Sequence, residues 1–251
     1  MKVHERQIRI LDELAAHKKV HTNELADLLV VSRETIRRDL LDLEECGSVT
    51  RIHGGAVLPK HAIIPEPRFS DRLETHAAGK HDIGRVASTL VEPGSTLYID
   101  AGTTTLAFAR VLADLQISLR IITNSIEIAQ LVARSEQFEV LLLGGVPHMD
   151  VPATYGELTF SEIDRFLADS AVISPVAYHS VRGASDYELH EAEVARQMIR
   201  RSKSCIMLCN KDKIEQQSRV TICRPEEIDH LVTDADADAA ITLPRGTVHF
   251  A

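Results

Sequence analysis

S-R-E-T-I-R-R-D, residues 32–39, is followed by L-x-x-L-E-x-x-G and then by R-I-H-G-G-A, which begins at Arg51. Ser32 is a residue type that caps helix N-termini. After it, apolar residues recur at i, i+4 and i+7: Ile36, Leu40 and Leu43. This spacing gives a helix one apolar face to bury. The stretch therefore predicts a helix that starts at the serine and keeps its arginines, Arg33, Arg37 and Arg38, off that face.

Two shorter helices are predicted before this one. The first has an apolar face made by Ile8, Leu11 and Leu14. The second is expected to have Thr22 as its cap and to contain Leu25, Leu28 and Leu29. A tight connection at Val30 and Val31 then leads into the third helix. Three short helices joined in this way indicate a helix-turn-helix module.

A basic strand and a turn follow the third helix. Gly47 is expected to end the helix, S-V-T-R-I-H alternates as a strand does, and Gly54 and Gly55 turn the chain. The simplest assembly is a winged helix-turn-helix, in which the start of the third helix faces base edges while arginines and hydroxyls also hold phosphates. The candidate DNA contacts are Ser32, Arg33, Thr35, Arg37, Arg38, Arg51 and His53.

Charge alone does not identify this module as DNA-binding. Residues 1–60 hold ten Lys plus Arg and ten Asp plus Glu, so the rest of the chain carries the whole net charge of −9. Three arginines on an isolated helix would ordinarily be a solvated face, but the cap, the apolar register and the wing agree here. The basic residues must then gather on one side, with the acidic residues elsewhere: Asp12, Glu13, Asp27, Glu44 and Glu45.

The N-terminal pattern also carries a family resemblance. From Glu5 to Ala56 the chain reads R-Q-x-x-I-L, then E-L-A-x-x-L-x-V-S-x-x-T-I-R-R-D-L, then R-x-H-G-G-A. This pattern resembles the signature of the DeoR family of bacterial transcriptional regulators. The resemblance implies a double-stranded DNA operator as partner and, most often in the family, repression.

Composition argues against several other classes of protein. No apolar run approaches the roughly 20 residues that cross a bilayer, and the N-terminus lacks a signal-peptide core, so we expect a cytoplasmic protein with no membrane partner. The cysteines, Cys46, Cys205, Cys209 and Cys223, show no C-x-x-C spacing, which favours reduced structural thiols. The histidines form no helix-spaced pair with a carboxylate between them. We therefore predict no metal site and no cofactor.

The chain is long enough for two domains. We predict a DNA-binding domain at residues 1–57, a proline-bearing linker at residues 58–78 and a second domain at residues 79–251. Apolar strands are expected there at 96–100, 120–124, 139–145, 171–174, 205–210 and 230–234, and helices at 104–113, 125–134 and 190–202. Continuous apolar strands alternating with helices predict an α/β domain with a mostly parallel sheet covered on both faces.

Polar residues gather where the predicted strands end. Asp100 ends the first strand, Gly102 permits close backbone approach, and three threonines open the next helix. The second strand ends in T-N-S and the third in Gly144 and Gly145. Ligands of parallel sheets bind at the carboxyl ends of strands, and a helix N-terminus favours an anion such as phosphate. One hydroxyl-rich turn alone would only cap a helix, but several at successive strand ends indicate a binding site.

This second domain resembles the DeoR family as well. D-x-G-T-T-T, I-T-N-S, L-x-G-G and a lysine in N-K-D-K resemble the family's effector domain, a relative of sugar-phosphate isomerases. The resemblance implies a Rossmann-like, sugar-isomerase-like fold that binds a phosphorylated sugar or sugar acid, and a lysine suits either anion. The effector-binding candidates are Asp100, Gly102, Thr103, Thr104, Thr105, Asn124, Ser125, Gly144, Gly145 and Lys213.

The chain departs from the family pattern in two places. In the late segment D-x-S-K-F-G, Asn210 replaces the aspartate and Glu215 the glycine. The family's glycine-rich G-x-x-G-I after the fourth strand is replaced by a segment with several polar residues: His179, Arg182, Tyr187, His190 and Glu191. These residues either contact polar groups of an unusual ligand or, alternatively, simply open a helix with acids at its positive end.

The leading hypothesis is a DNA-binding regulator of carbohydrate or sugar-acid metabolism that is controlled by a small phosphorylated metabolite. Effector binding would shift the population of domain arrangements that differ in operator affinity, and symmetric operators imply a homodimer or homotetramer. The alternative is a sugar-phosphate isomerase with an appended DNA module, in which Asp100 would be the base. A purely structural DNA-bridging protein is disfavoured by the polar strand ends.

Overall fold

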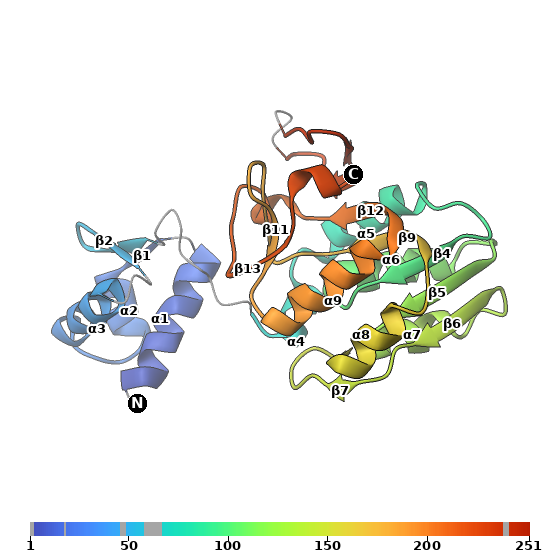
Figure 1. Ribbon diagram of the computed structural model, residues 1–251. Helices are drawn as coiled ribbons and strands as arrows, with labels where there is room; N and C mark the ends of the chain where they lie inside the picture. Colours follow the sequence, from blue (N-terminus) through green and yellow to red (C-terminus); the bar gives the residue numbers. More distant parts are fainter. Residues whose placement is uncertain (1–2, 18, 46–48, 58–66, 238–240) are drawn as a thin grey trace. The chain divides into compact units, whose positions relative to one another are not determined.

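The computed structural model describes residues 3–17, 19–45, 49–57, 67–237 and 241–251. The chain divides into two compact units, Met1–Pro65 and Glu66–Ala251, which we describe separately. Figure 1 shows the elements of both units along the chain.

The N-terminal unit is a three-helix module with a small antiparallel sheet. Its elements are α1 (Val3–His17), β1 (Lys19–His21), α2 (Thr22–Leu28), α3 (Arg33–Glu45), β2 (Thr50–Ile52) and β3 (Gly55–Val57). The sheet has the order β1-β3-β2, with β2 and β3 forming the wing. The predicted winged helix-turn-helix is confirmed.

The core of this unit follows the apolar face expected for α3. Ile36 and Leu40 are fully buried, and Leu43 is nearly so, against the apolar residues of α1 and α2. Of the leucines expected in the second helix, Leu25 and Leu29 are buried in this core, whereas Leu28, at the end of α2, is exposed. Thr22, the expected cap of α2, is instead the first residue of that helix. The N-cap of α2 is His21, whose side chain makes no capping hydrogen bond. Gly47 lies outside the described residues.

The wing turn requires glycine at two positions for two different reasons. Gly54 has φ +81°, the left-handed region that glycine adopts readily. At Gly55 a Cβ atom would lie 1.9 Å from the carbonyl oxygen of Val20 on the neighbouring strand. The amide of Thr22 donates to the Gly54 carbonyl at 2.9 Å, so the start of α2 is tied to the wing.

The second unit is built on a seven-stranded sheet with the order β15-β14-β12-β9-β4-β5-β6, in which every neighbouring pair is parallel. Its strands are β4 (Thr96–Ile99), β5 (Leu119–Thr123), β6 (Phe138–Leu142), β9 (Ala168–Ile173), β12 (Ser202–Leu208), β14 (His230–Thr233) and β15 (Thr247–Phe250). The predicted parallel α/β sheet is confirmed.

Helices and shorter strands complete this unit. The helices are α4 (Phe69–Glu74), α5 (Ala77–Ser88), α6 (Thr103–Ala113), α7 (Ile126–Val132), α8 (Glu157–Ile163) and α9 (Leu189–Arg200), with 3-10 turns at Lys211–Lys213 and Pro225–Glu227. The strands β7 (Val146–Pro147) and β8 (Thr154–Tyr155) form a hairpin. A third sheet contains β10 (Ala177–His179), β11 (Gly183–Asp186) and β13 (Val220–Cys223).

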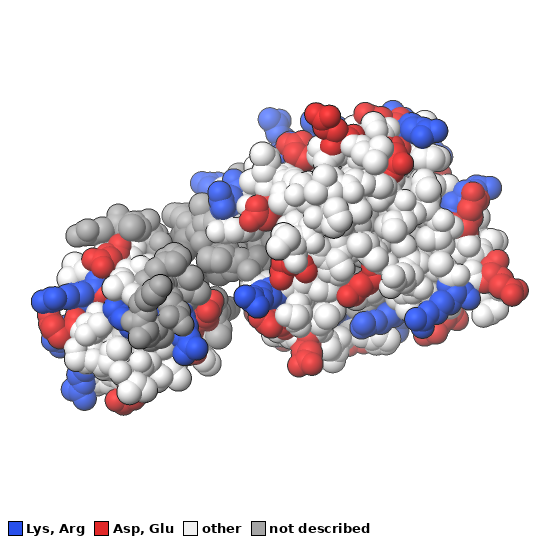
Figure 2. Space-filling view, turned by 90° about the horizontal axis from the view of Figure 1, so that it is seen from below, with Lys and Arg blue, Asp and Glu red and all other residues white. Residues whose placement is uncertain are grey.

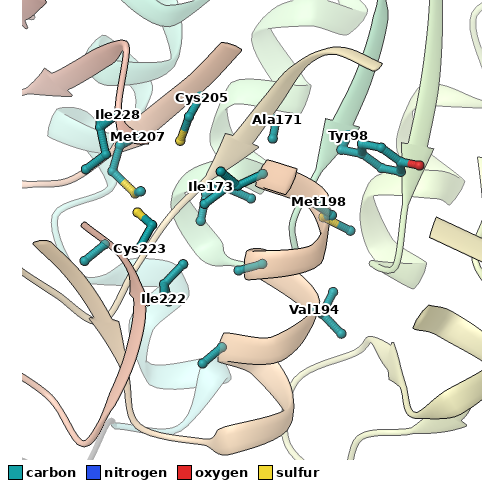
Figure 3. Close-up of a cluster of buried hydrophobic side chains, with 14 of the residues drawn as sticks. Tyr98, Ala171, Ile173, Val194, Met198, Cys205, Met207, Ile222, Cys223 and Ile228 are labelled. Atoms are coloured by element: carbon teal, nitrogen blue, oxygen red, sulfur yellow. The ribbon is translucent and has the colours of Figure 1, made fainter. Parts of the chain in front are cut away.

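Both faces of the large sheet are buried, because alternate residues of each strand enter different cores. On β4, Leu97 and Ile99 join the core that also contains α5, α6 and α7, whereas Tyr98 faces the core that contains α8 and α9. On β12, Ile206 enters the first core and Met207 the second. Figure 3 shows the second core around α9. Burial on both faces explains why the strands read as continuous apolar runs.

The linker expected at residues 58–78 needs correction in its C-terminal part. Residues 58–66 lie outside the described residues, but α4 and the start of α5 fall within the remainder. Phe69 is buried in the first core, and its amide donates to the Asp150 carboxylate at 2.9 Å. A single aromatic anchor thus makes residues 69–74 part of the second unit, despite the prolines that precede them.

The buried thiols agree with the structural role predicted for them. Cys205, Cys209 and Cys223 are free and buried, and Figure 3 shows two of them among apolar side chains. Burial raises the pKa of Cys209 and of Cys223 to about 12, which keeps both as unreactive thiols. Cys46 lies outside the described residues. Among the described helices, none has the length and apolar character needed to span a membrane.

Candidate DNA-binding surface and effector site

The predicted cap of the recognition helix is present. The Ser32 hydroxyl accepts the Thr35 amide at 3.1 Å, and the two hydroxyls lie 2.8 Å apart. Arg33, Arg37 and Arg38 are exposed on α3, away from its apolar face. The cap thus fixes where the helix begins, and the exposed guanidinium groups can reach a phosphate or a base edge.

The predicted separation of basic from acidic residues is wrong at the wing. Glu44 at the end of α3 lies 3.7 Å from the Arg51 guanidinium and accepts the Arg51 amide at 2.9 Å. Arg37 lies 3.5 Å from Glu34, but both side chains remain mostly exposed. Figure 2 shows basic and acidic side chains interspersed on the face of the N-terminal unit that is in view. Of the candidate wing contacts, His53 is exposed, whereas Arg51 is already paired.

A buried ion pair joins the first and third helices. The Arg6 guanidinium donates to both carboxylate oxygens of Asp39, at 2.5 and 2.9 Å, and both side chains are over nine-tenths buried. This hydrogen-bonded pairing raises the pKa of Arg6. The two residues are the first and last charged positions of the motif R-Q-x-x-I-L … R-R-D-L. Asp39 therefore acts in the fold rather than at the DNA.

The effector candidates lie at the point where the order of the large sheet reverses. From β4 the chain proceeds outward through β5 and β6, and then returns to β9 on the other side of β4. Such a switch point leaves a crevice at the carboxyl ends of the two central strands, where ligands of open parallel sheets bind. Asp100 directly follows β4, and Gly102 is the N-cap of α6, so both lie at this crevice.

Lys213 approaches the same crevice from a distant part of the chain. Its ammonium donates to the Pro175 carbonyl at 2.6 Å, just beyond the end of β9. The neighbouring Ser174 is close to Gly102, because a Cβ atom built on that glycine would lie 3.5 Å from the Ser174 Cβ. The structure thus brings the lysine, the end of β9 and the N-terminus of α6 to one edge of the sheet.

Several buried polar atoms at the strand ends have no hydrogen-bond partner within the described residues. They are the hydroxyls of Thr104 and Thr233 and the side-chain carbonyls of Asn124 and Asn210. All four residues are over nine-tenths buried. Since buried polar groups are almost always paired in folded proteins, such a concentration at the carboxyl end of one sheet is what a polar ligand would satisfy.

Other predicted site residues have their polar groups engaged within the fold. The Thr105 hydroxyl donates to the Gly102 carbonyl, and the Ser125 hydroxyl accepts the Ile128 amide as the cap of α7. The Gly144 amide donates to the Glu162 carboxylate at 2.6 Å. Gly145 has φ +147°, and a Cβ atom there would lie 2.5 Å from the Tyr155 carbonyl oxygen. These residues shape the site, and their contact with an effector stays a prediction.

A small pocket opens beside Asp100 and Asn124. The β7–β8 hairpin and the first turn of α9 supply much of its remaining wall, including His148, Tyr155, His190 and Glu191. The sequence indicated His190 and Glu191 only as one of two alternatives, and His148 and Tyr155 were missed. The hairpin and α9 are far apart in sequence, so no local pattern signals that they meet.

The rings of the pocket form one connected group. The Tyr155 and His190 ring centroids lie 4.2 Å apart, and those of His190 and His148 lie 4.9 Å apart. The His190 Nε2 atom is buried without a hydrogen-bond partner within the described residues. Burial, and secondarily the neighbouring His148, lowers the pKa of His190, which favours its neutral form.

The same residues also fit the outline of a metal site, but their hydrogen bonds argue against one. His148, His190 and Glu191 each place one ligand atom within 4.8 Å of the others. However, His148 Nδ1 accepts the amides of Asp150 and Val151, at 3.1 and 2.9 Å. A neutral imidazole that accepts at Nδ1 carries its hydrogen on Nε2, the atom that faces Glu191 at 3.6 Å. That nitrogen therefore has no lone pair for a cation.

The remaining polar residues of this segment interact elsewhere. His179 accepts the Val181 amide and lies 3.7 Å from Glu215, while Arg182 donates to Gln217. The Arg219 guanidinium lies 4.8 Å above the Tyr187 ring. None of these three candidates, His179, Arg182 and Tyr187, lines the pocket beside Asp100.

Comparison with known proteins agrees with both units. Residues 6–62 match the DeoR-like helix-turn-helix domain, and residues 75–235 match the DeoR C-terminal sensor domain. The chain belongs to the DeoR family. This DeoR-family chain is 36% identical to the transcriptional repressor GlcR of Bacillus subtilis, over 92% of its own length and 88% of GlcR. It is 30% identical to the glycerol-3-phosphate regulon repressor of Haemophilus influenzae, over 98% and 91% of the two chains.

Comparison with solved structures gives only a weak likeness. The match to ribose 5-phosphate isomerase A of Methanocaldococcus jannaschii extends over 58% of this chain and 55% of the isomerase chain, with 15% identity and a TM-score of 0.41. A similarity this weak supports no statement about activity. Both of these relatives in sequence are named as repressors, and the DeoR-family chain has the helix-turn-helix domain of a DNA-binding regulator.

Proposed function

We propose that this DeoR-family chain represses genes of carbohydrate or sugar-acid metabolism and is controlled by a phosphorylated sugar or a related metabolite. One observation carries the proposal: the N-terminus of α6, Lys213 and the unpartnered buried polar atoms of Thr104 and Asn124 lie at the carboxyl edge of the sheet, beside its switch point. Free amides at a helix start and a lysine suit a phosphate, while buried acceptors suit hydroxyls. One relative is named for a glycerol-3-phosphate regulon, which fits this class of effector.

The proposed effector contacts are Asp100, Gly102, Thr103, Thr104, Asn124 and Lys213, with Thr105, Ser125, Gly144 and Gly145 shaping the site around them. The proposed DNA contacts are Arg33, Arg37, Arg38 and His53, with Ser32, Thr35 and Arg51 placing the helix and the wing. Measuring operator binding by fluorescence anisotropy, with and without a panel of sugar phosphates, tests both parts. A panel in which no compound binds the protein would refute the sensor part.

Arg37→Ala is expected to weaken operator binding. The Arg37 side chain is largely exposed and its contact with Glu34 is at the limit of an ion pair, so it is available to a phosphate. Loss of one phosphate contact should reduce the magnitude of the negative slope of log K against log salt by about 1. Anisotropy titrations at several salt concentrations measure this slope. Arg9→Ala, which removes an exposed arginine from α1, is the matched control. Equal slopes for Arg37→Ala and the unaltered protein would remove Arg37 from the interface.

We further propose that the repressor is a homo-oligomer that uses the edge of the sheet at β6. This edge strand, the β7–β8 hairpin and α8 expose several large apolar side chains: Leu141, Leu142, Val146, Met149 and Leu158. Open sheet edges are usually protected by charge or proline, and an exposed apolar edge fits pairing with a second copy. Two half-sites on an operator also call for two recognition helices.

Val146→Glu is therefore expected to shift the oligomer toward monomer, because it places a charge in the apolar contact. Size-exclusion chromatography with light scattering at several concentrations measures the change. Val181→Glu, at an exposed apolar position in the β10–β11 turn, is the control and should leave the mass unchanged. A Val146→Glu protein with the mass of the unaltered protein at every concentration would place the interface elsewhere.

A further inference from the structure

The pocket beside Asp100 offers hydrogen-bond groups of a defined kind. His148 Nδ1 is occupied by two backbone amides, so the ring presents Nε2–H as a donor. The other polar groups are mainly acceptors. The Asp100 carboxylate accepts the Ala101 amide at 2.8 Å, and the Glu191 carboxylate lies 3.6 Å from His148 Nε2. The side-chain carbonyl of Asn124 is buried and has no partner in the described structure. A pocket of this composition matches a ligand rich in hydroxyl groups.

The pocket also lacks the groups that would neutralise an anion. No lysine or arginine is among the described residues that line it. The first turn of α9 borders the pocket, and a helix N-terminus ordinarily attracts negative charge. Here Glu191 belongs to that first turn, so the protein's own carboxylate already lies at this positive end. A ligand carboxylate in the pocket would face two protein carboxylates, Asp100 and Glu191.

The aromatic wall adds a preference for a sugar-like surface. The rings of Tyr155 and His190 are tilted by 31° to one another, and the ring of His148 follows next to that of His190. The apolar side chains of Val151, Ala153 and Val194 line the same pocket. Ligand pockets of this kind combine an apolar wall with a few polar groups that fix orientation. Hydroxyls could meet the acceptors while C–H groups pack on the rings.

We infer that this pocket binds the uncharged polyhydroxyl end of the effector and discriminates against a carboxylate at that end. The inference rests on the proposed function, in which the phosphate lies at the N-terminus of α6 and Lys213. It narrows that proposal: of the two ligand classes, phosphorylated sugars and phosphorylated sugar acids, the pocket selects the sugars. In this inference, the Glu191 carboxylate repels a carboxylate of the ligand, and His148 Nε2–H donates a hydrogen bond to a ligand hydroxyl.

Matched pairs of compounds that differ only in oxidation at one carbon test the inference. We would measure calorimetric affinities for glucose 6-phosphate against 6-phosphogluconate, ribose 5-phosphate against 5-phosphoribonate, and glyceraldehyde 3-phosphate against 3-phosphoglycerate. In any pair that binds, the sugar is expected to bind at least about tenfold more tightly than the acid, because like charges placed together are strongly unfavourable. Glu191→Gln should reduce this ratio several-fold by removing one of the repelling charges.

Glu193→Gln is the matched control, because Glu193 lies on the same helix and pairs with Arg196 rather than lining the pocket. It should leave the ratio unchanged. An acid that binds as tightly as its sugar, or a ratio that Glu191→Gln does not alter, would overturn the inference while leaving the phosphate site intact. Failure of every sugar phosphate and every acid to bind would instead refute the proposed function. Melting temperatures of the variants show whether each is folded.

Discussion

Asp39→Ala is expected to unfold most of the N-terminal unit while the sensor unit stays folded. The substitution leaves the Arg6 guanidinium buried, with its hydrogen-bonding carboxylate gone. Breaking a buried ion pair by removing one partner typically costs about 3–5 kcal/mol. A module of this size has a total stability of only about 3–9 kcal/mol. Operator binding should therefore be lost through unfolding, although the Asp39 side chain is buried against Arg6.

Urea denaturation followed by circular dichroism measures this effect as an early loss of helix. Asp42→Ala is the matched control, since Asp42 is an exposed aspartate on the same helix and should shift the midpoint little. The double variant Arg6→Met with Asp39→Leu should recover much of the stability, because apolar residues of similar volume leave no buried charge unpaired. An Asp39→Ala protein that unfolds at the same urea concentration as the unaltered protein would show that the pair contributes little.

The elements of both units could be predicted because their signals are local. The 3.6-residue spacing of Ile36 and Leu40 and the unbroken apolar runs of the strands each arise from contacts that every residue of an element makes with one core. The strand ends could be predicted for the same reason. Where a parallel strand stops, a polar residue such as Asp100 must follow at the edge that binds ligands.

The pairings between distant residues could not be predicted in this way. Arg6 and Asp39 are 33 positions apart, and neither has a pattern that identifies the other as its partner. Phe69 contacts Asp150 across 81 positions, so the composition of residues 58–78 favoured a linker where a packed helix begins. His148 joins His190 only because the β7–β8 hairpin folds onto the start of α9. The part of the candidate site that contains His148 and His190 depends on these tertiary contacts.

Replacing Thr103 and Thr104 with valine is expected to abolish the effector response while operator binding remains. Both side chains are buried in the first turn of α6, and the Thr104 hydroxyl is one of the unpartnered polar atoms of the described structure. Valine has nearly the shape of threonine, and removing a hydroxyl that has no protein partner costs the folded state little or even stabilises it. A bound effector, by contrast, would lose hydrogen bonds in a desolvated site, at about 1–3 kcal/mol for each bond.

Losing two such bonds lowers effector affinity by roughly 30-fold to more than 10⁴-fold, which places binding beyond ordinary metabolite concentrations. Anisotropy titration of operator release by the effector measures this loss. Thr89→Val, which changes a threonine near the end of α5 whose hydroxyl donates to the Val86 carbonyl, is the control and should respond normally. Simultaneous loss of operator binding and of thermal stability in the double variant would indicate misfolding. A stable variant that still responds to the effector would place the phosphate away from the N-terminus of α6.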